Sequence, residues 1–177
     1  MNVWTWNVNS VRSKVSNVNE LLKKHNIDVL VLTETKIKEE HEKTVSEQID
    51  KNYSCIWNSN KTSYYHGVGI LYKKTIEVTL LKTHLSRKVT AIDSEICKLT
   101  NSKKMDQGLK DKDKLVDDMK KGHKTEGRII SVQCKLGDFI CVIVGSYVPN
   151  SGVTRGDPLK RLAYRTLMWD KDLYDYL

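Results

Sequence analysis

One stretch limits the fold of this chain more than any other, the run DVLVLTETK at residues 28–36. A short, unbroken apolar run of this kind is typical of a strand that is buried on both faces. The run ends in Glu34, so a carboxylate is expected at the rim of the core, where α/β folds place their chemistry. Many strands end in a glutamate that has no function, and Glu34 alone leaves both interpretations open.

The residues before this run predict a strand and a helix. Residues 2–8 alternate polar with aromatic or β-branched side chains, which indicates a strand. Apolar residues then recur every three or four positions up to Leu22, which indicates one face of a helix ending near residues 25–26. Two strands joined by a helix with short connections are expected to be parallel neighbours, so Asn7 and Glu34 should meet at one edge of the sheet.

Further strands are predicted downstream, joined mainly by tight turns. The segment 76–81 follows 67–72 after a short turn, and we expect the two to pair as a hairpin. The segments 127–134 and 139–144 flank another turn and predict a second hairpin. Because 139–144 is apolar on both faces, we expect it in the middle of a covered sheet.

The remaining regions differ in character. The length of 177 residues corresponds to one domain. From about residue 86 to 124 the apolar pattern fails and Lys alternates with Asp, which predicts a solvated, charged insertion. A nucleic-acid-binding arm is the alternative, and the mixed signs of charge count against it. A last helix is predicted after Pro158, and Trp4, Trp6 and Trp169 are expected in the core.

Composition narrows the partners and the compartment. Lys and Arg number 30 against 22 acidic residues, a net charge of +8 that favours a polyanionic partner, nucleic acid first. A Lys-rich surface without such a partner has the same composition. The four cysteines form no Cys-x-x-Cys pair, so neither a disulfide framework nor a zinc site is indicated. No secretion signal or membrane-length apolar stretch is present, which favours a soluble, intracellular protein that is not secreted and has no membrane partner.

The candidate chemistry lies where three predicted strands end. Asn7, Glu34 and Tyr147 each follow a strand, and no Ser–His or Cys–His pair is suggested. A carboxylate with amides and a phenol suits a hard divalent cation and an oxyanion. Mg²⁺ typically binds through one or two carboxylates, keeps several waters and acts as a Lewis acid on phosphoryl groups.

Several short segments together carry a family resemblance. The chain resembles the exonuclease III-type apurinic/apyrimidinic (AP) endonucleases of the endonuclease/exonuclease/phosphatase superfamily. Asn7 and Glu34 alone match the superfamily, whereas the segments 147–152 and 161–165 point to the AP endonuclease branch. The matching segments, in the family's order, are WNVNSVR at 6–12, LTETK at 32–36, GVGIL at 67–71, EGR at 126–128, YVPNSG at 147–152, and RLAYR at 161–165 with WD at 169–170.

The resemblance implies a fold and an extent. Family members are longer and are built from two similar α/β halves, and this chain matches only the first. The implied fold class is therefore α/β (α+β), half of a four-layered α/β sandwich with a mixed β-sheet and helices on one face. Residues 1–177 are expected to form this N-terminal half, with the charged insertion at about 86–124. One face of the sheet is then expected to be bare and apolar.

The resemblance also implies residue roles. Glu34 looks like the metal ligand and Asn7 its neighbour in the metal site, for Mg²⁺ with Mn²⁺ as a substitute. Asn9 stands where some members have a ligating Asp, which weakens any second carboxylate ligand. Tyr147 and Asn150 look like catalytic residues that contact the scissile phosphate. Contacts with the DNA backbone are implied for Arg12, Lys36 and Arg155.

The implied function is Mg²⁺-dependent hydrolysis of DNA phosphodiesters at abasic sites, with 3′–5′ exodeoxyribonuclease activity as a second implied reaction. The family's later motifs, an Asp-x-Asn segment, a further Asp and a terminal Asp-His pair, are not found in this sequence. We therefore expect the chain to be incomplete alone and a separate C-terminal half to be a partner, alongside abasic duplex DNA. The alternative is a non-catalytic DNA-binding or regulatory fragment, whereas the 147–152 segment disfavours a phosphatase or lipid phosphodiesterase.

Overall fold

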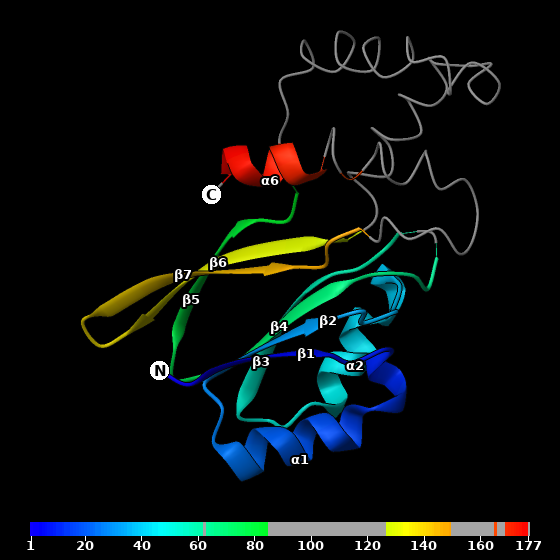
Figure 1. Cartoon of the computed structure of the whole chain (residues 1–177). Helices are drawn as coiled ribbons and strands as arrows, with labels where there is room; N and C mark the ends of the chain where they lie inside the picture. The colour runs from blue at the N-terminus through cyan, green and yellow to red at the C-terminus, as the bar shows by residue number, and fades with distance from the viewer. Residues whose placement is uncertain (62, 85–126, 150–164, 166–168, 177) are drawn as a thin grey trace, which may run out of the picture. The chain divides into compact units, whose positions relative to one another are not determined.

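The computed structural model describes residues 1–61, 63–84, 127–149, 165 and 169–176. The chain divides into two compact units, Met1–His84 with Thr125–Tyr147, and Leu85–Lys124 with Val148–Leu177. The described part of the first unit holds two β-sheets and two α-helices, and that of the second unit holds helix α6 (Asp170–Tyr176) (Figure 1). The predicted insertion at 86–124, Asn150 and Arg155 lie outside the described residues.

The first unit begins with the predicted strand, helix and strand. Strand β1 (Val3–Asn7) leads through α1 (Val15–His25) to β2 (Val29–Thr33). The two strands are parallel and pair from Val3 opposite Val29 to Asn7 opposite Thr33. Their C-terminal ends therefore lie side by side, as the sequence predicted.

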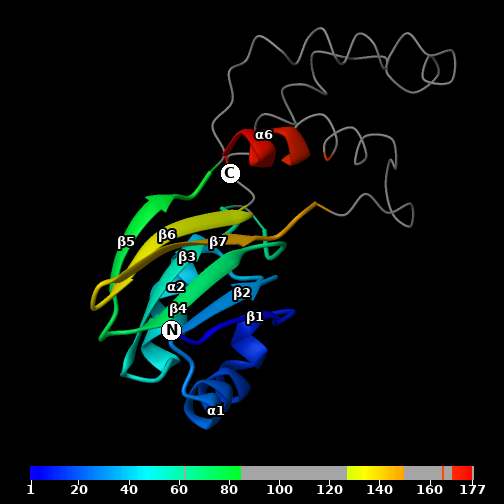
Figure 2. The ribbon, with the colours of Figure 1, turned by 60° about the vertical axis from the view of Figure 1, so that its left-hand side comes forward.

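Two further strands complete the first sheet. Strand β4 (Val68–Lys73) is antiparallel to β2, and β3 (Tyr53–Asn58) is antiparallel to β4. The strand order is β1-β2-β4-β3, so the sheet is mixed. Helices α1 and α2 (Glu42–Gln48) cover one face of this sheet (Figures 1 and 2). The predicted fold class, a mixed β-sheet with helices on one face, is confirmed.

A second, antiparallel sheet covers the other face. It consists of β5 (Glu77–Lys82), β6 (Ile129–Leu136) and β7 (Phe139–Ser146), in that order. The first sheet is therefore covered on both faces. The exposed apolar side chains of the described residues lie instead on strands of the second sheet, among them Leu80, Ile140 and Val142. The alternation of β2 explains both contacts, because Leu30 and Leu32 pack toward the helices while Val29 and Val31 pack toward the second sheet.

The expected hairpin between 67–72 and 76–81 is also wrong. Strand β4 is flanked on both sides, by β2 and β3, so neither of its edges is free for β5. The chain instead crosses to the second sheet at Ile76, which is only 4% exposed and packs between the two sheets. Strand β5 then pairs with β6, which arrives from much later in the sequence.

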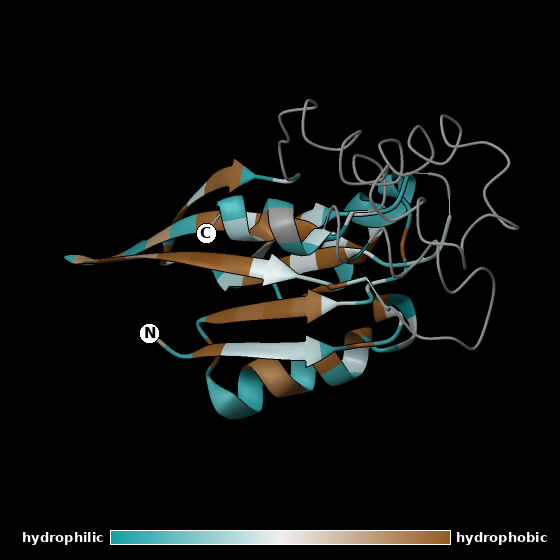
Figure 3. Cartoon of the chain, turned by 45° about the horizontal axis from the view of Figure 1, so that its top comes forward, coloured by the Kyte–Doolittle hydropathy of each residue, from teal (hydrophilic) through white to brown (hydrophobic). Residues whose placement is uncertain are grey.

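The hairpin of β6 and β7 is present, but β7 is not in the middle of its sheet. Strand β6 occupies the middle because β5 pairs with its other side, and β7 is left as an edge strand. Phe139, Ile140 and Val142 are each more than half exposed. Figure 3 shows β7 brown, that is hydrophobic, over most of its length. The described residues leave part of this apolar strand exposed.

The tryptophans fall into two groups. Trp169, in the second unit, is buried as expected. Trp4 is 37% exposed, so its expected place in the core is wrong, and the reason is that β1 is an edge strand of the first sheet.

In the second unit, Arg165 Nε lies 3.5 Å from Asp170 Oδ2. No helix in the described part of the chain combines the length and the apolar character needed to cross a membrane.

Candidate metal and phosphate site

Backbone hydrogen bonds join three segments at the C-terminal ends of β1 and β2. Ser10 N–H donates to the Glu34 carbonyl at 2.8 Å, and Lys36 N–H donates to the His66 carbonyl at 2.9 Å. Thr35 N–H donates to the Gly67 carbonyl at 3.2 Å. The segment 34–36 after β2 is thus held from both sides, by the segment that follows β1 and by the one that precedes β4.

This region has an unusual backbone. Left-handed φ values are uncommon for residues other than glycine and cost about 1–3 kcal/mol where the side chain is bulky. Such strain tends to gather at functional sites, where surrounding contacts hold it in place. Apart from Asn26, which caps α1, the described non-glycine residues with positive φ are Asn9 (46°), Ser10 (87°), Glu34 (53°), Lys36 (50°) and His66 (65°).

The Glu34 carboxylate is the centre of the site. Its Oε1 accepts a hydrogen bond from Asn7 Nδ2 at 3.0 Å and another from the Tyr147 hydroxyl at 2.9 Å. Its Oε2 lies 3.1 Å from Lys36 Nζ. The structure therefore brings together four of the sequence-predicted site residues, including Tyr147, which lies 113 positions from Glu34 in the chain.

Asn9 supports this arrangement from the segment after β1. Its backbone N–H donates to Asn7 Oδ1 at 3.3 Å, and its Oδ1 accepts a short hydrogen bond from Lys36 Nζ. Lys36 is therefore held between a carboxylate and an amide oxygen. Asn9 here orients its neighbours, and the expectation that Asn at this position weakens a second carboxylate ligand stays a prediction.

Tyr147 is held by two residues, Arg128 and His66, to which the sequence reasoning assigned no role. Its backbone N–H donates to the Arg128 carbonyl at 2.8 Å, and Arg128 Nη1 donates to the Tyr147 carbonyl at 3.3 Å. Arg128 Nη2 lies 3.1 Å from His66 Nε2, which must accept because a guanidinium can only donate. The rings of His66 and Tyr147 are 5.8 Å apart. The only sequence signals were the EGR segment and the position of His66 before Gly67.

Arg12, predicted to contact DNA, lies in a separate cluster. Its guanidinium carbon is 4.4 Å from the centre of the Tyr64 ring, and Lys38 Nζ is 4.7 Å from the same centre. Both distances are typical of cation–π contacts. The cluster presents two cations beside a partly exposed tyrosine, a surface suited to a phosphate backbone. Tyr64 carried no signal in the sequence beyond its aromatic type.

The pKa values at the centre follow from these contacts. Partial burial would raise the pKa of Glu34, but the hydrogen bonds from Asn7, Lys36 and Tyr147 outweigh it and hold this pKa below its ordinary value. The pKa of Tyr147 is raised by burial and by its hydrogen bond to Glu34. Glu34 is therefore ionised, and Tyr147 keeps its proton, at neutral pH.

We expect Glu34 to make the stability of the fold depend on pH. A carboxylate whose pKa is lower in the folded than in the unfolded state stabilises the fold above the unfolded value of 4.5, and this contribution disappears as the pH falls through the folded value. Urea unfolding of wild type and Glu34→Gln should therefore give a difference in free energy at neutral pH that shrinks at about pH 3. A difference that is the same at both pH values would contradict this account of the Glu34 contacts.

The donor set can be tested against the implied metal. The described residues contain no group of three or more His, Cys, Asp or Glu side chains that could enclose an ion. The site instead offers one ionised carboxylate, Glu34, and one amide oxygen, Asn7 Oδ1. Mg²⁺ binds in this manner, through few protein ligands and several waters, whereas structural zinc requires about four nitrogen or sulfur ligands. The residues present fit Mg²⁺ or Mn²⁺.

Comparison with known proteins identifies the family to which the chain belongs. The model of the Endonuclease/Exonuclease/phosphatase family matches residues 4–163. No match was found among curated proteins. Among solved structures, an AP endonuclease from Leishmania major gives a TM-score of 0.63 at 19% identity. The matched region covers 99% of this chain and 46% of the Leishmania chain. An AP endonuclease from Archaeoglobus fulgidus gives 0.61 at 21%, covering 100% and 51%.

A third solved structure is the 3′ phosphatase NExo from Neisseria bound to a product DNA hairpin. It gives a TM-score of 0.54 at 19% identity, and the matched region covers 97% of this chain and 51% of the NExo chain. At these identities the likeness concerns the fold. The chain spans about half the length of the solved structures that it matches, and its interpretation as an N-terminal half stays a prediction.

Proposed function

We propose that this chain, which belongs to the Endonuclease/Exonuclease/phosphatase family, carries the residues that bind the cation and the phosphate in a DNA-repair nuclease. The reaction is Mg²⁺-dependent hydrolysis of DNA phosphodiesters at abasic sites, with 3′–5′ exodeoxyribonuclease activity as a secondary reaction. The observation that carries this proposal is the Glu34 carboxylate, which gathers Asn7, Lys36 and Tyr147 at the ends of strands from two sheets.

In this proposal Glu34 and Asn7 hold the cation, Mg²⁺ or Mn²⁺. When bound, the cation supplies Lewis-acid polarisation of a phosphoryl oxygen. Glu34 also orients the Tyr147 hydroxyl and the Lys36 ammonium, which are a neutral donor and a positive charge beside the same carboxylate. Both are suited to stabilise negative charge that develops on phosphoryl oxygens, and Asn150 is assigned the same task.

The contacts with DNA are assigned to basic side chains around this centre. Lys36 lies in it, Arg12 lies with Lys38 against Tyr64, and Arg155 is assigned from the resemblance. The net charge of +8 adds non-specific attraction to a polyanion. Binding through phosphate contacts releases counterions, so affinity should fall steeply with salt.

The assignment to the AP endonuclease branch rests on the segments 147–152 and 161–165, and two of the structurally similar proteins described above are AP endonucleases. The second candidate is a non-catalytic DNA-binding or regulatory fragment. It is favoured by one observation, that the chain spans only about half of those proteins. In either case a separate C-terminal half is a proposed partner.

A cleavage assay separates the two candidates. The purified chain is mixed with an end-labelled duplex that contains one abasic site, with Mg²⁺ or with a chelator, at several salt concentrations. Chelator-sensitive cleavage next to the abasic site supports the nuclease. Salt-sensitive binding without cleavage supports the binding fragment, and an absence of both contradicts the proposed function.

A further inference from the structure

Among the residues that the structure describes, no strand pairs with the outer edge of β1, which is therefore called an open edge. The Asn2 carbonyl accepts from the N–H groups of Asp28 and Val29, and Val8 N–H donates to the Thr33 carbonyl, so the even-numbered residues face β2. Because backbone groups alternate along a strand, the N–H and C=O groups of Val3 and Thr5 point away from the sheet. Natural edge strands are usually guarded by charges or Pro, and β1 has neither.

Strand β7 ends the second sheet in the same unguarded way. It contains no charged residue and no Pro, although Phe139, Ile140 and Val142 are exposed. The other edge strand of this sheet, β5, begins with Glu77 and ends with Lys82, as expected for an edge that meets solvent. The other edge strand of the first sheet, β3, also contains no charged residue and no Pro. What distinguishes β1 and β7 is that residues of both strands line one groove.

The two open edges lie on the same side of the unit. Strand β7 packs over β2 and β4, so the second sheet stops one strand short of β1. The space left there is a groove of about 350 Å³, the strand groove, between the two sheets. A strand that continued the second sheet beyond β7 would lie in it. The groove is lined mainly by small and β-branched side chains, among them Val3, Thr5, Val31, Thr33, Ile143 and Gly145.

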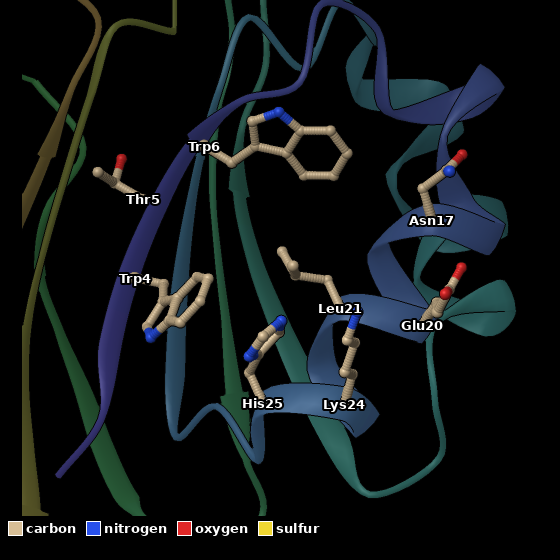
Figure 4. Close-up of a pocket in the computed structure, with 8 residues that line it drawn as sticks. All are labelled: Trp4, Thr5, Trp6, Asn17, Glu20, Leu21, Lys24 and His25. Carbon is tan, nitrogen blue, oxygen red and sulfur yellow. The ribbon is translucent and has the colours of Figure 1, made fainter.

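A second hollow lies on the opposite face of β1. This tryptophan pocket, about 430 Å³, lies between β1 and α1 and includes Trp4, Trp6, Leu21 and His25 (Figure 4). Figure 4 shows Trp4 and Trp6 pointing toward α1 and Thr5 pointing the other way. A strand added beside β1 would send alternate side chains toward the pocket and toward the groove, the arrangement by which edge strands bind an extended chain.

We propose that the strand partner is a second copy of this chain. A two-fold axis along the strand groove places β1 of each copy beside β7 of the other. The four-stranded sheet of one copy then continues into the three-stranded sheet of its partner, which closes both open edges at once. One surface that carries both complementary edges is what an isologous dimer requires.

The lack of charge on these two strands also favours a second copy. Strands β1 and β7 are uncharged, so no like charges meet at the contact despite the net charge of +8. The inference concerns assembly and holds whether or not the chain cleaves DNA.

Light scattering after gel filtration, over a range of protein concentrations, tests the dimer. The wild-type chain should be a dimer, and Val3→Lys should raise its dissociation constant by about a hundredfold, because an unpaired charge enters the groove. The matched control is Leu80→Lys in β5, since Leu80 and Val3 have similar exposures of 48% and 44%. This control should leave the dimer intact.

A backbone variant tests the strand pairing itself. Thr5→Pro removes an N–H that points away from β2, so it should leave the fold intact and still prevent the dimer, whereas Thr5→Val should preserve it. Circular dichroism verifies that each variant is folded. A wild-type monomer at every concentration would overturn the proposal and leave the edges to a different polypeptide. A dimer that survives both Val3→Lys and Thr5→Pro would also overturn it.

Discussion

Glu34→Gln is expected to weaken the binding of Mn²⁺ by this chain about a hundredfold or more, because the hard cation loses the one ionised carboxylate in its site. Gln has nearly the shape of Glu, so the contact with the Tyr147 hydroxyl can persist while the negative charge is lost. Titration of the protein into Mn²⁺, followed by electron paramagnetic resonance of the free ion, measures the affinity. Any Mg²⁺-dependent cleavage of abasic DNA should fall in parallel.

The matched control for this substitution is Glu77→Gln. The Glu77 side chain is 73% exposed in β5 and its carboxylate lies 4.0 Å from Lys135, outside the site. This change removes the same charge and should leave Mn²⁺ affinity unaltered. Equal affinities of wild type and Glu34→Gln would show that the cation binds elsewhere.

Gly67→Ala is expected to have the largest effect on stability of any single methyl group added to the site. Gly67 has φ +89°, and a Cβ there would lie 2.1 Å from Thr35 Oγ1. Thr35 is fully buried and its backbone N–H is bonded to the Gly67 carbonyl, so it cannot move aside without disturbing Glu34 and Lys36. We expect a loss of about 3 kcal/mol or more in the free energy of unfolding, measured by urea denaturation.

Gly137→Ala separates the two causes of this loss. Gly137 also has a positive φ, of +60°, but a Cβ there would meet no atom within 4 Å. It should therefore report only the backbone cost, about 1 kcal/mol. If both variants lose the same stability, close packing against Thr35 is not what holds the segment after β2.

The meeting of Asn7 and Glu34 could be predicted from sequence because it follows from local rules. A helical repeat between two strands with short connections gives parallel neighbours, and parallel neighbours end at the same edge. The pairing of Val3 with Val29 through Asn7 with Thr33 has this register. The place of Tyr147 was suggested by its position at a strand end and by the family resemblance, and its hydroxyl reaches Glu34.

The errors concern which strand is an edge strand. The apolar pattern of β7 is that of a covered strand, yet β5 takes the other side of β6 and leaves β7 at the edge. The apolar pattern of a strand indicates that it has apolar neighbours, but it does not indicate which segment provides them. The same limitation applies to Trp4, whose exposure follows from the place of β1 in the sheet order.

The supporting residues of the site could not be predicted for a different reason. Arg128 lies opposite Tyr147 because the β6–β7 pairing continues past Ile129 and Ser146. His66 reaches both residues from the segment before β4, where it has a left-handed φ, and no pattern in the sequence indicated that conformation. The Tyr64 cluster with Arg12 and Lys38 depends on the same segment. Contacts between irregular segments depend on the whole fold more than on any local pattern.

Nuclear magnetic resonance of the labelled chain with substoichiometric Mn²⁺ tests the central claim most directly. The paramagnetic ion broadens signals of nearby nuclei, so the side-chain amide of Asn7 and the backbone amides of Glu34 and Lys36 should broaden first. Residues of β5 at the far edge of the second sheet should remain sharp. Broadening centred on other residues, with Asn7 and Glu34 unaffected, would contradict a divalent-cation site at the ends of β1 and β2.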